Sequence, residues 1–392
     1  MGHVKPMLPL LEGLAGAGLR VVCYGHGDFE AVIASTGATF APYPSVDYDI
    51  HAPDFNLVRM AADLIDASQV IHPALLDEVR DLHPALIVQD FMALWGSRIG
   101  TALAVPRVHT VPTLVFNAAT RRRMRQEDGM AKLLRDAAQG IVPLARATID
   151  SRFGVSIGEA FGLDGSWRRL APPVCEIVFC LDHLQPGRPK GRVARHYVGP
   201  SFRSGGPNVA STDMKGHALV TFGTLSNNET ARFAAAIEGA CEAGYSVIGQ
   251  CGDKVDRTRL EGLARTLEAR HPGRTVRVLG SVPDLETLIA GAAVVIHHAG
   301  MATTWETVRH STPALFIPTI ADQKVLAGEL ERNGYGLRLT SGSECDPAAI
   351  SQGLRRLRGR VPRWDAIHRR IARAGGAERG VAVIRDVLEA VR

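Results

Sequence analysis

The sequence predicts an α/β protein of two doubly wound domains, each with a parallel sheet between layers of helices. Apolar runs of four to eight residues alternate with helical patterns along the whole chain. Parallel strands that are covered on both faces produce such runs, and their alternation with helices is typical of βαβ units. The length of 392 residues also exceeds that of one ordinary domain.

The apolar runs that we interpret as strands fall into two groups. They cover residues 19–24, 85–90, 106–111 and 176–181 in the first half, and 217–223, 245–251, 275–280, 293–298 and 314–318 in the second. Between the groups lies a stretch rich in Gly, Ser and Pro that lacks periodicity, as an interdomain linker does. We therefore predict one domain over 1–200, a linker over 201–216 and a second domain over 217–375.

Composition and charge restrict the class of partner. The chain is 46% hydrophobic and 22% charged, and its net charge of +5 comes from 45 basic and 40 acidic residues. It has no basic stretch interleaved with aromatic residues of the kind that single-stranded nucleic acid requires, and no apolar run of membrane-spanning length. The six cysteines are scattered and read as reduced core residues. We expect a cytoplasmic protein, a monomer or homodimer, with no nucleic-acid partner and no stable membrane anchor.

The first residues predict a helix that begins just after His3. Met7, Leu10, Leu11 and Leu14 have the spacing of a core-facing helix. In a doubly wound sheet a central strand precedes such a helix, but only two residues stand before His3. We therefore expect the first strand to be missing and its neighbours to lack a partner. A misplaced start, a removed stretch or replacement by another segment would each explain this.

The most informative stretch is AVVIHHAGMATTWETV, residues 293–308. It predicts a strand, a turn of small residues and a helix whose first turn contains Thr303 and Thr304. Free backbone N–H groups and the helix dipole make such a corner a binding site for an anion. His298 at the end of the strand adds one more donor, although threonines here are also ordinary helix caps.

Two acidic positions follow this corner and suggest a nucleotide sugar as the ligand. Glu306, one turn into the helix, suits the vicinal hydroxyls of a ribose. Asp322 and Gln323 follow the next strand and suit the hydroxyls of a sugar, although such a pair is also a common helix cap.

These residues together resemble the donor-binding signature of family-1 glycosyltransferases of the GT-B fold, and within that family the bacterial macrolide-type enzymes that glycosylate antibiotics and other natural products. The match covers nearly the whole chain. The stretches that carry it are Gly2-His3-Val4 with Pro6, PALIVQDFMALWG, YVGPSF, VTFGTLSN, RVLGSVPDLETL, the 298–306 segment with Pro313, Pro318 and Asp322-Gln323, and AGGAERGVAVIRDVLEAV.

The resemblance implies a fold and a role for each matching residue. The two Rossmann-like domains would face each other across a cleft, with the C-terminal helix, residues 376–392, packing back on the first domain. The acceptor hydroxyl would lose its proton to His3, which Asp90 would orient. The donor would be bound by Gly223, Thr224, His298, Gly300, Thr303 and Thr304 at the diphosphate, Glu306 at the ribose, Val282 at the base, and Asp322 and Gln323 at the sugar.

The implied activity is inverting transfer of a sugar from a UDP- or dTDP-sugar to a hydroxyl of a small natural product, such as a polyketide, macrolide or phenol. A histidine suits proton removal at neutral pH, and amides and hydroxyls at the diphosphate stabilise the leaving group without a metal or another cofactor. Asp284 stands where Gln is common, which leaves UDP versus dTDP open. Two alternatives remain: a catalytically impaired GT-B homologue that acts as a binding or auxiliary partner, and a nucleotide-sugar epimerase.

Overall fold

The chain forms two compact units. The computed structural model describes residues 2–44, 57–127, 138, 172–187, 191, 193–203, 214, 216–223, 229–252, 254–282, 284–339, 342–360 and 362–391. The N-terminal unit comprises His3–Arg203 and Ile371–Arg392, and the C-terminal unit comprises Ser204–Arg370 together with Met1–Gly2. Among the described residues, no helix is both long and apolar enough to cross a membrane.

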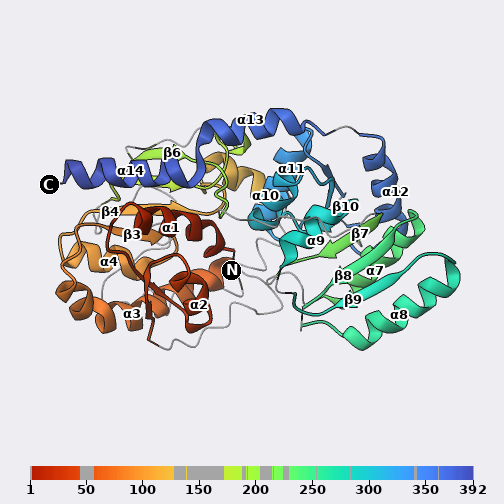
Figure 1. Cartoon of the computed structure of the whole chain (residues 1–392), viewed down its shortest axis with the longest axis horizontal. Helices are drawn as coiled ribbons and strands as arrows, with labels where there is room; N and C mark the ends of the chain where they lie inside the picture. The colour runs from red at the N-terminus through yellow and green to blue at the C-terminus, as the bar shows by residue number, and fades with distance from the viewer. Residues whose placement is uncertain are drawn as a thin grey trace. The chain divides into compact units, whose positions relative to one another are not determined.

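The C-terminal unit contains a six-stranded parallel sheet with the order β12-β11-β10-β7-β8-β9 (Figure 1). From β7 the chain adds β8 and β9 on one side, then returns to add β10, β11 and β12 on the other. The order therefore reverses between β7 and β10, and ligands of such sheets bind where the order reverses. The strands are β7 (His217–Thr221), β8 (Ser246–Gln250), β9 (Val276–Leu279), β10 (Val294–His297), β11 (Ala314–Phe316) and β12 (Leu337–Arg338).

Helices between these strands bury the apolar residues of the sheet. The largest core cluster joins the inward side chains of β7, β8 and β10 to those of α7 (Thr230–Glu242) and α12 (Pro347–Arg358). In this cluster the rings of Phe222 and Phe233 make a T-shaped contact. Gly239 lets two helices approach closely, because a Cβ there would lie 2.6 Å from the carbonyl oxygen of Pro347. The helices are α7 (Thr230–Glu242), α8 (Arg257–Arg270), α9 (Leu285–Gly291), α10 (Met301–Arg309), α11 (Ala321–Arg332) and α12 (Pro347–Arg358), and α13 (Trp364–Ala374) follows them.

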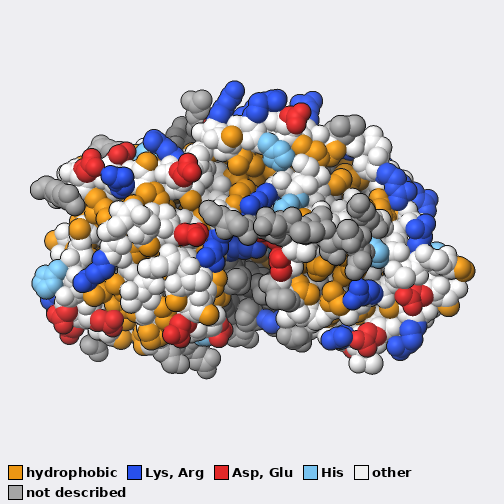
Figure 2. All heavy atoms as spheres, viewed as in Figure 1, with side chains coloured by type: hydrophobic (Ala, Val, Ile, Leu, Met, Phe, Trp, Pro, Cys, Tyr) orange, Lys and Arg blue, Asp and Glu red, His pale blue; other side chains and the backbone are white. Residues whose placement is uncertain are grey.

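Basic side chains gather over α12 and α13 on the face shown in Figure 2. Two of those on α12 have structural roles at the C-terminal end of α7. Arg355 donates to the carbonyl of Glu242 at 2.9 Å, and Arg358 donates to that of Ala243 at 3.0 Å while its guanidinium lies over the ring of Tyr245. Cations at the C-terminal end of a helix complement its dipole, so these two arginines stabilise the packing of α12 on α7.

The N-terminal unit divides its strands between two sheets. One is the four-stranded parallel sheet β3-β4-β5-β6, and the other is the parallel pair β1-β2. Within the described residues, β1 pairs only with β2 and β3 pairs only with β4. The strands are β1 (Val22–Gly25), β2 (Thr39–Pro42), β3 (Ile87–Asp90), β4 (Arg107–Val111), β5 (Cys175–Val178) and β6 (Ala194–Tyr197). The helices are α1 (Leu8–Gly16), α2 (Glu30–Ala34), α3 (Leu57–Asp81), α4 (Leu94–Ala102) and α14 (Gly376–Ala390), with short 3-10 helices at Lys5–Met7, Gly27–Phe29 and Asp182–Leu184.

Helices on both faces hold these two sheets together. On one face α1 contributes to two clusters: Leu8 and Leu11 pack with residues around β1, whereas Leu10 and Leu14 pack with β4 and β5. On the other face, residues of both sheets contact one cluster built from α3 and α4. Side-chain packing therefore joins β1 to β3, where a continuous sheet would use backbone hydrogen bonds.

Helix α14 packs against α1 through small residues. The backbone at Gly13 lies so close to Val381 that a Cβ would be 2.7 Å from that side chain, and Gly380 is similarly close to Leu10. Val383 and Ile384 join the same core cluster as Leu10. The end of the chain therefore completes the core of the N-terminal unit.

The predicted α/β class with parallel sheets is confirmed, and every apolar run interpreted as a strand overlaps an observed strand. Strands β2, β6 and β12 were not predicted from the sequence. All cysteines were also predicted to lie in the core, which is wrong for Cys345, an exposed thiol, and for Cys23, which is half-buried. Residues 2–4 form a turn and the predicted helix begins at Leu8, after a 3-10 turn.

The open edge of β3 predicts a specific difference in amide hydrogen exchange. Ile87 and Phe91 donate to carbonyls on the β4 side, so strand alternation turns the amide of Val88 to the other edge, where no described residue accepts it. Val108 lies in fully buried β4, which is paired on both sides. We expect the Val88 amide to exchange faster than that of Val108, measured by NMR. Equal protection would show that the edge of β3 is covered.

Candidate active site

The loops that follow β7 and β10 meet where the strand order of the C-terminal unit reverses. Gly223 follows β7 in the left-handed region, with φ +64°. A Cβ at Gly223 would lie 2.6 Å from Cε1 of His298, the residue that follows β10. The imidazole is therefore packed against the backbone of the first loop, and only glycine fits there.

A short turn connects β10 to α10 and leaves the start of the helix open. Ala299 has φ +60°, which is unusual for a residue with a side chain and is the kind of backbone strain found at functional sites. Gly300 is the N-cap of α10 and makes no side-chain cap. The first N–H groups of a helix have no partner within it, so this end of α10 presents donors and the positive end of a dipole.

Two buried polar atoms on residues that we predicted to bind the donor have no hydrogen-bond partner among the described residues. They are Nδ1 of His298 and Oγ1 of Thr304, whose residues are 7% and 0% exposed. An unsatisfied buried polar group costs about 1–3 kcal/mol, so such groups are rare in proteins and require an explanation. A bound anion that accepts hydrogen bonds from both groups would supply the missing partner.

His298 is neutral at neutral pH. Burial and, to a smaller extent, the positive charge of Arg232 together lower its pKa to about 4. The neighbouring His297 is also held neutral, because burial lowers its pKa well below the usual value. Its Nδ1 accepts a hydrogen bond from the N–H of Ala299 at 3.2 Å, which helps to fix the turn.

The sequence analysis did not single out Arg232. It lies in the first turn of α7 and forms an ion pair with Glu229, and its guanidinium stands 5.9 Å from the centroid of the Phe222 ring. Its charge acts on His298, so it lies in the electrostatic surroundings of the corner. In the sequence only its place after the FGTLSNNET loop points to such a role.

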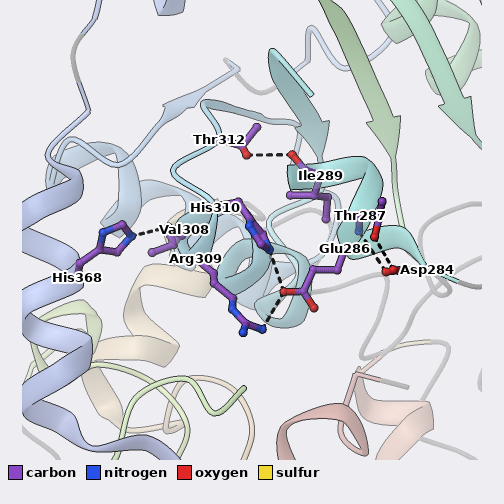
Figure 3. A network of polar contacts seen from close by, with 9 residues as sticks. All are labelled: Asp284, Glu286, Thr287, Ile289, Val308, Arg309, His310, Thr312 and His368. Carbon is purple, nitrogen blue, oxygen red and sulfur yellow. Dashed lines mark hydrogen bonds and ion pairs between the residues drawn. The ribbon is translucent and has the colours of Figure 1, made fainter. Parts of the chain in front are cut away.

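The other residues predicted to bind the donor are distributed around this corner. Thr303 and Glu306 are buried in the first two turns of α10, and Val282 is half-buried in the loop before α9. In that loop Asp284 caps α9 by accepting a hydrogen bond from the N–H of Thr287 at 3.1 Å (Figure 3). Thr224 lies outside the described residues.

Gln323 acts as part of a helix cap. Its Oε1 accepts hydrogen bonds from the N–H and hydroxyl of Thr319 and from the N–H of Ile320, at 2.9–3.3 Å. Asp322 is half-buried in the first turn of α11. The side-chain carbonyl of Gln323 therefore has the capping role that we considered as an alternative. Sugar binding by Asp322 and Gln323 stays a prediction.

The N-terminal unit brings His3 and Asp90 together. Nδ1 of His3 lies 2.8 Å from Oδ2 of Asp90, and Oδ1 of Asp90 accepts the N–H of Met92 at 2.9 Å. When ionised, a carboxylate only accepts hydrogen bonds, so Nδ1 carries the proton and Nε2 is the basic atom of the neutral ring. Asp90 ends β3 as predicted. His3 lies in a turn just before the first helix.

An aromatic row begins at His3. Its ring lies nearly parallel to that of Phe91, and Phe91 is stacked in the same way on Phe116, with 6.1 Å between centroids at each step. All three side chains are at least partly exposed. The imidazole therefore lies beside a flat apolar surface.

The predicted residues do not form one cluster within either unit. The His3–Asp90 pair belongs to the N-terminal unit, whereas the predicted donor-binding residues that the structure describes belong to the C-terminal unit. Within the described part of the chain, no group of three or more His, Cys, Asp or Glu side chains could hold a metal ion.

The fold of this protein is that of the GT-B class. Residues 260–374 match the family model described as the C-terminal domain of erythromycin biosynthesis protein CIII-like proteins. They contain most of α8, the 281–284 loop, His298 and the start of α10. The predicted resemblance is confirmed: this segment is similar to EryCIII-like C-terminal domains, and the chain has the fold of solved antibiotic glycosyltransferases.

Relatives and solved structures extend the match to the whole chain. The chain is 25% identical over 393 residues to the NDP-glycosyltransferase YjiC of Bacillus subtilis (strain 168), covering 98% of this chain and 94% of that protein. The crystal structure of the glycosyltransferase of kitacinnamycin matches with a TM-score of 0.75 and 20% identity over 99% and 96% of the chains. The spinosyn rhamnosyltransferase SpnG complexed with thymidine diphosphate matches with a TM-score of 0.64 and 17% identity over 98% and 96%, and SpnG has also been solved with spinosyn aglycone.

The buried, neutral state of His298 predicts a loss of stability in acid. Its folded pKa of about 4 lies below the unfolded value of 6.5, so between these values the unfolded chain binds more protons. The free energy of unfolding should therefore fall as the pH decreases through this range. Replacing the imidazole by an amide, His298→Asn, should remove on the order of 2 kcal/mol of the loss between about pH 7 and about pH 5. Urea unfolding at both pH values measures this, and an unchanged pH dependence in the variant would contradict it.

Proposed function

We propose that this protein is an inverting glycosyltransferase that moves a sugar from a UDP- or dTDP-sugar to a hydroxyl of a small natural-product acceptor. The observation that carries the proposal is the pair of unsatisfied buried donors, His298 Nδ1 and Thr304 Oγ1, at the uncapped start of α10. They lie inside the segment that matches the EryCIII-like domain. An anion with several acceptor oxygens, such as a nucleoside diphosphate, suits this corner.

In the proposed reaction the C-terminal unit stabilises the leaving group. The N–H groups of α10, the hydroxyl of Thr304 and the neutral imidazole of His298 would donate to the diphosphate, with the charge of Arg232 nearby. These groups need no metal for that task. Glu306 would bind the ribose, Val282 the base, and Asp322 and Gln323 the transferred sugar, as the family resemblance implies.

The N-terminal unit would supply the base and the acceptor surface. Nε2 of His3 removes the proton of the acceptor hydroxyl as its oxygen attacks the anomeric carbon, and the bond to the diphosphate breaks on the opposite face. The configuration at that carbon is thereby inverted. Asp90 holds the ring and balances the charge of the imidazolium.

The aromatic row favours an acceptor with a flat or largely apolar body. Phe91 and Phe116 offer ring faces beside His3, so a phenol or a polyketide could lie on them while its hydroxyl reaches Nε2. The similar protein SpnG has been solved with spinosyn aglycone. This supports the general class of acceptor.

Acceptor-dependent nucleotide release tests the proposal directly. We expect UDP-glucose or a dTDP-sugar, incubated with a phenolic acceptor, to yield nucleoside diphosphate and an acceptor heavier by one sugar, measured by mass spectrometry. Tight nucleotide binding without transfer for any pairing would favour the impaired homologue that acts as a binding partner. An altered donor sugar without any acceptor would favour an epimerase.

Variants of the His3–Asp90 pair test the proposed base. His3→Ala should lower kcat about 100- to 10,000-fold, because the acceptor hydroxyl loses its base, while the KM for the donor stays unchanged. Asp90→Asn should lower kcat by a smaller factor, also without changing the donor KM. The matched control is His26→Ala, since His26 forms an exposed pair with Asp28 at 3.2 Å in the same unit. Full activity of His3→Ala would exclude His3 as the base.

A further inference from the structure

The loop predicted to bind the base is fixed to the helix that follows it. Residues 281–284 lead into α9, and Asp284 caps this helix through the N–H and the hydroxyl of Thr287 (Figure 3). A capped helix start fixes the direction from which the loop enters. Any element that holds α9 therefore also holds Asp284, the last residue of this loop.

One carboxylate connects α9 to the far end of α10. Oε1 of Glu286 accepts hydrogen bonds from Nη1 of Arg309 and from Nε2 of His310, each at 3.0 Å (Figure 3). The three side chains, which we call the Glu286 clamp, are only 15–29% exposed. Two donors on one shielded carboxylate are held more firmly than an exposed surface pair.

Two further contacts hold the same end of α10. The hydroxyl of Thr312 donates to the buried carbonyl of Ile289 at 2.9 Å, which ties the C-terminal half of α9 to the turn after α10. Nε2 of His368 on α13 lies 2.7 Å from the carbonyl oxygen of Val308 (Figure 3). Both ends of helix α9 are thus attached to the C-terminal end of α10, and α10 is also hydrogen-bonded to α13.

Helix α10 therefore has a diphosphate corner at its start and the Glu286 clamp at its end. The covalent chain between the base and the phosphates of a nucleoside diphosphate has a limited reach, so the affinity of the nucleotide depends on the placement of the base loop relative to the corner. We infer that the Glu286 clamp sets this placement, and that Glu286 is a positioning residue for the nucleotide. The inference rests on the proposed function, because it takes the corner as the diphosphate site.

Binding of two ligands separates positioning from general stability. Inorganic pyrophosphate would use only the corner at the start of α10, whereas UDP and dTDP would also use the base loop. For Glu286→Gln, which keeps the shape but loses the charge, we expect the Kd of the better-bound nucleotide to rise about tenfold and the Kd of pyrophosphate to stay unchanged, both by calorimetry. In turnover, the donor KM should rise while kcat and the acceptor KM change less than about twofold.

A milder variant and a matched control accompany this measurement. His310→Gln removes the imidazole donor and leaves Arg309 in place, so it should raise the nucleotide Kd by a smaller factor of about three. Glu238→Gln breaks an exposed pair with Arg270, 2.9 Å long, in the same unit, and should change neither Kd.

The outcomes distinguish this inference from the function on which it rests. If wild-type protein binds neither nucleotide nor pyrophosphate, the proposed function fails and the inference fails with it. If wild-type protein binds nucleotide and Glu286→Gln binds it equally well, only the inference is overturned. Equal weakening of nucleotide and pyrophosphate would also overturn it, because the clamp would then support the corner as a whole.

Discussion

The packing of one buried imidazole between two glycines is the constraint on which the C-terminal unit depends. A Cβ at Gly300 would lie 2.3 Å from Nε2 of His298, and one at Gly223 would lie 2.6 Å from Cε1. Two loops, each following a central strand, are thereby fixed around a single ring. The strand order brings these two loops together, and the left-handed turn at Ala299 and the uncapped start of α10 follow directly after the ring.

Burial of this ring also determines its chemistry. A charged imidazole would bind a diphosphate more strongly in isolation, but placing that charge in an apolar core beside Arg232 would be costly. The neutral ring avoids this cost and still donates one hydrogen bond. The positive charge of the corner then comes from the helix dipole and from Arg232, which can keep its ion pair with Glu229.

Local patterns explain how much of the fold was predictable. The strands that form the interiors of the sheets are continuous apolar runs, and the sequence analysis found them all. The missed strands lie at edges or are short: β2 and β6 contain exposed residues, and β12 has two residues. An edge strand buries little, so its sequence does not have to be apolar.

Site residues were predictable only where they are close together in the sequence. His298, Gly300, Thr303 and Thr304 stand together in the sequence, and the helix-start pattern reveals them. Arg232 comes near His298 only through the packing of α7, and the Glu286 clamp joins residues more than 20 positions apart. The capping role of Gln323 was predicted only as an alternative, because a side-chain amide in the first turn of a helix can either cap the helix or bind a ligand.

Opposite environments give the two central histidines different tasks in the proposed reaction. His298 is buried without a carboxylate partner in the described residues, which favours a ring that stays neutral and donates. His3 is about half exposed, at 47%, and contacts Asp90 directly, which favours a ring that can accept a proton and hold it. Pairs of titratable groups with opposed surroundings mark acid–base roles in enzymes. Exchanging the two environments would therefore abolish both tasks, even though the residue type is the same.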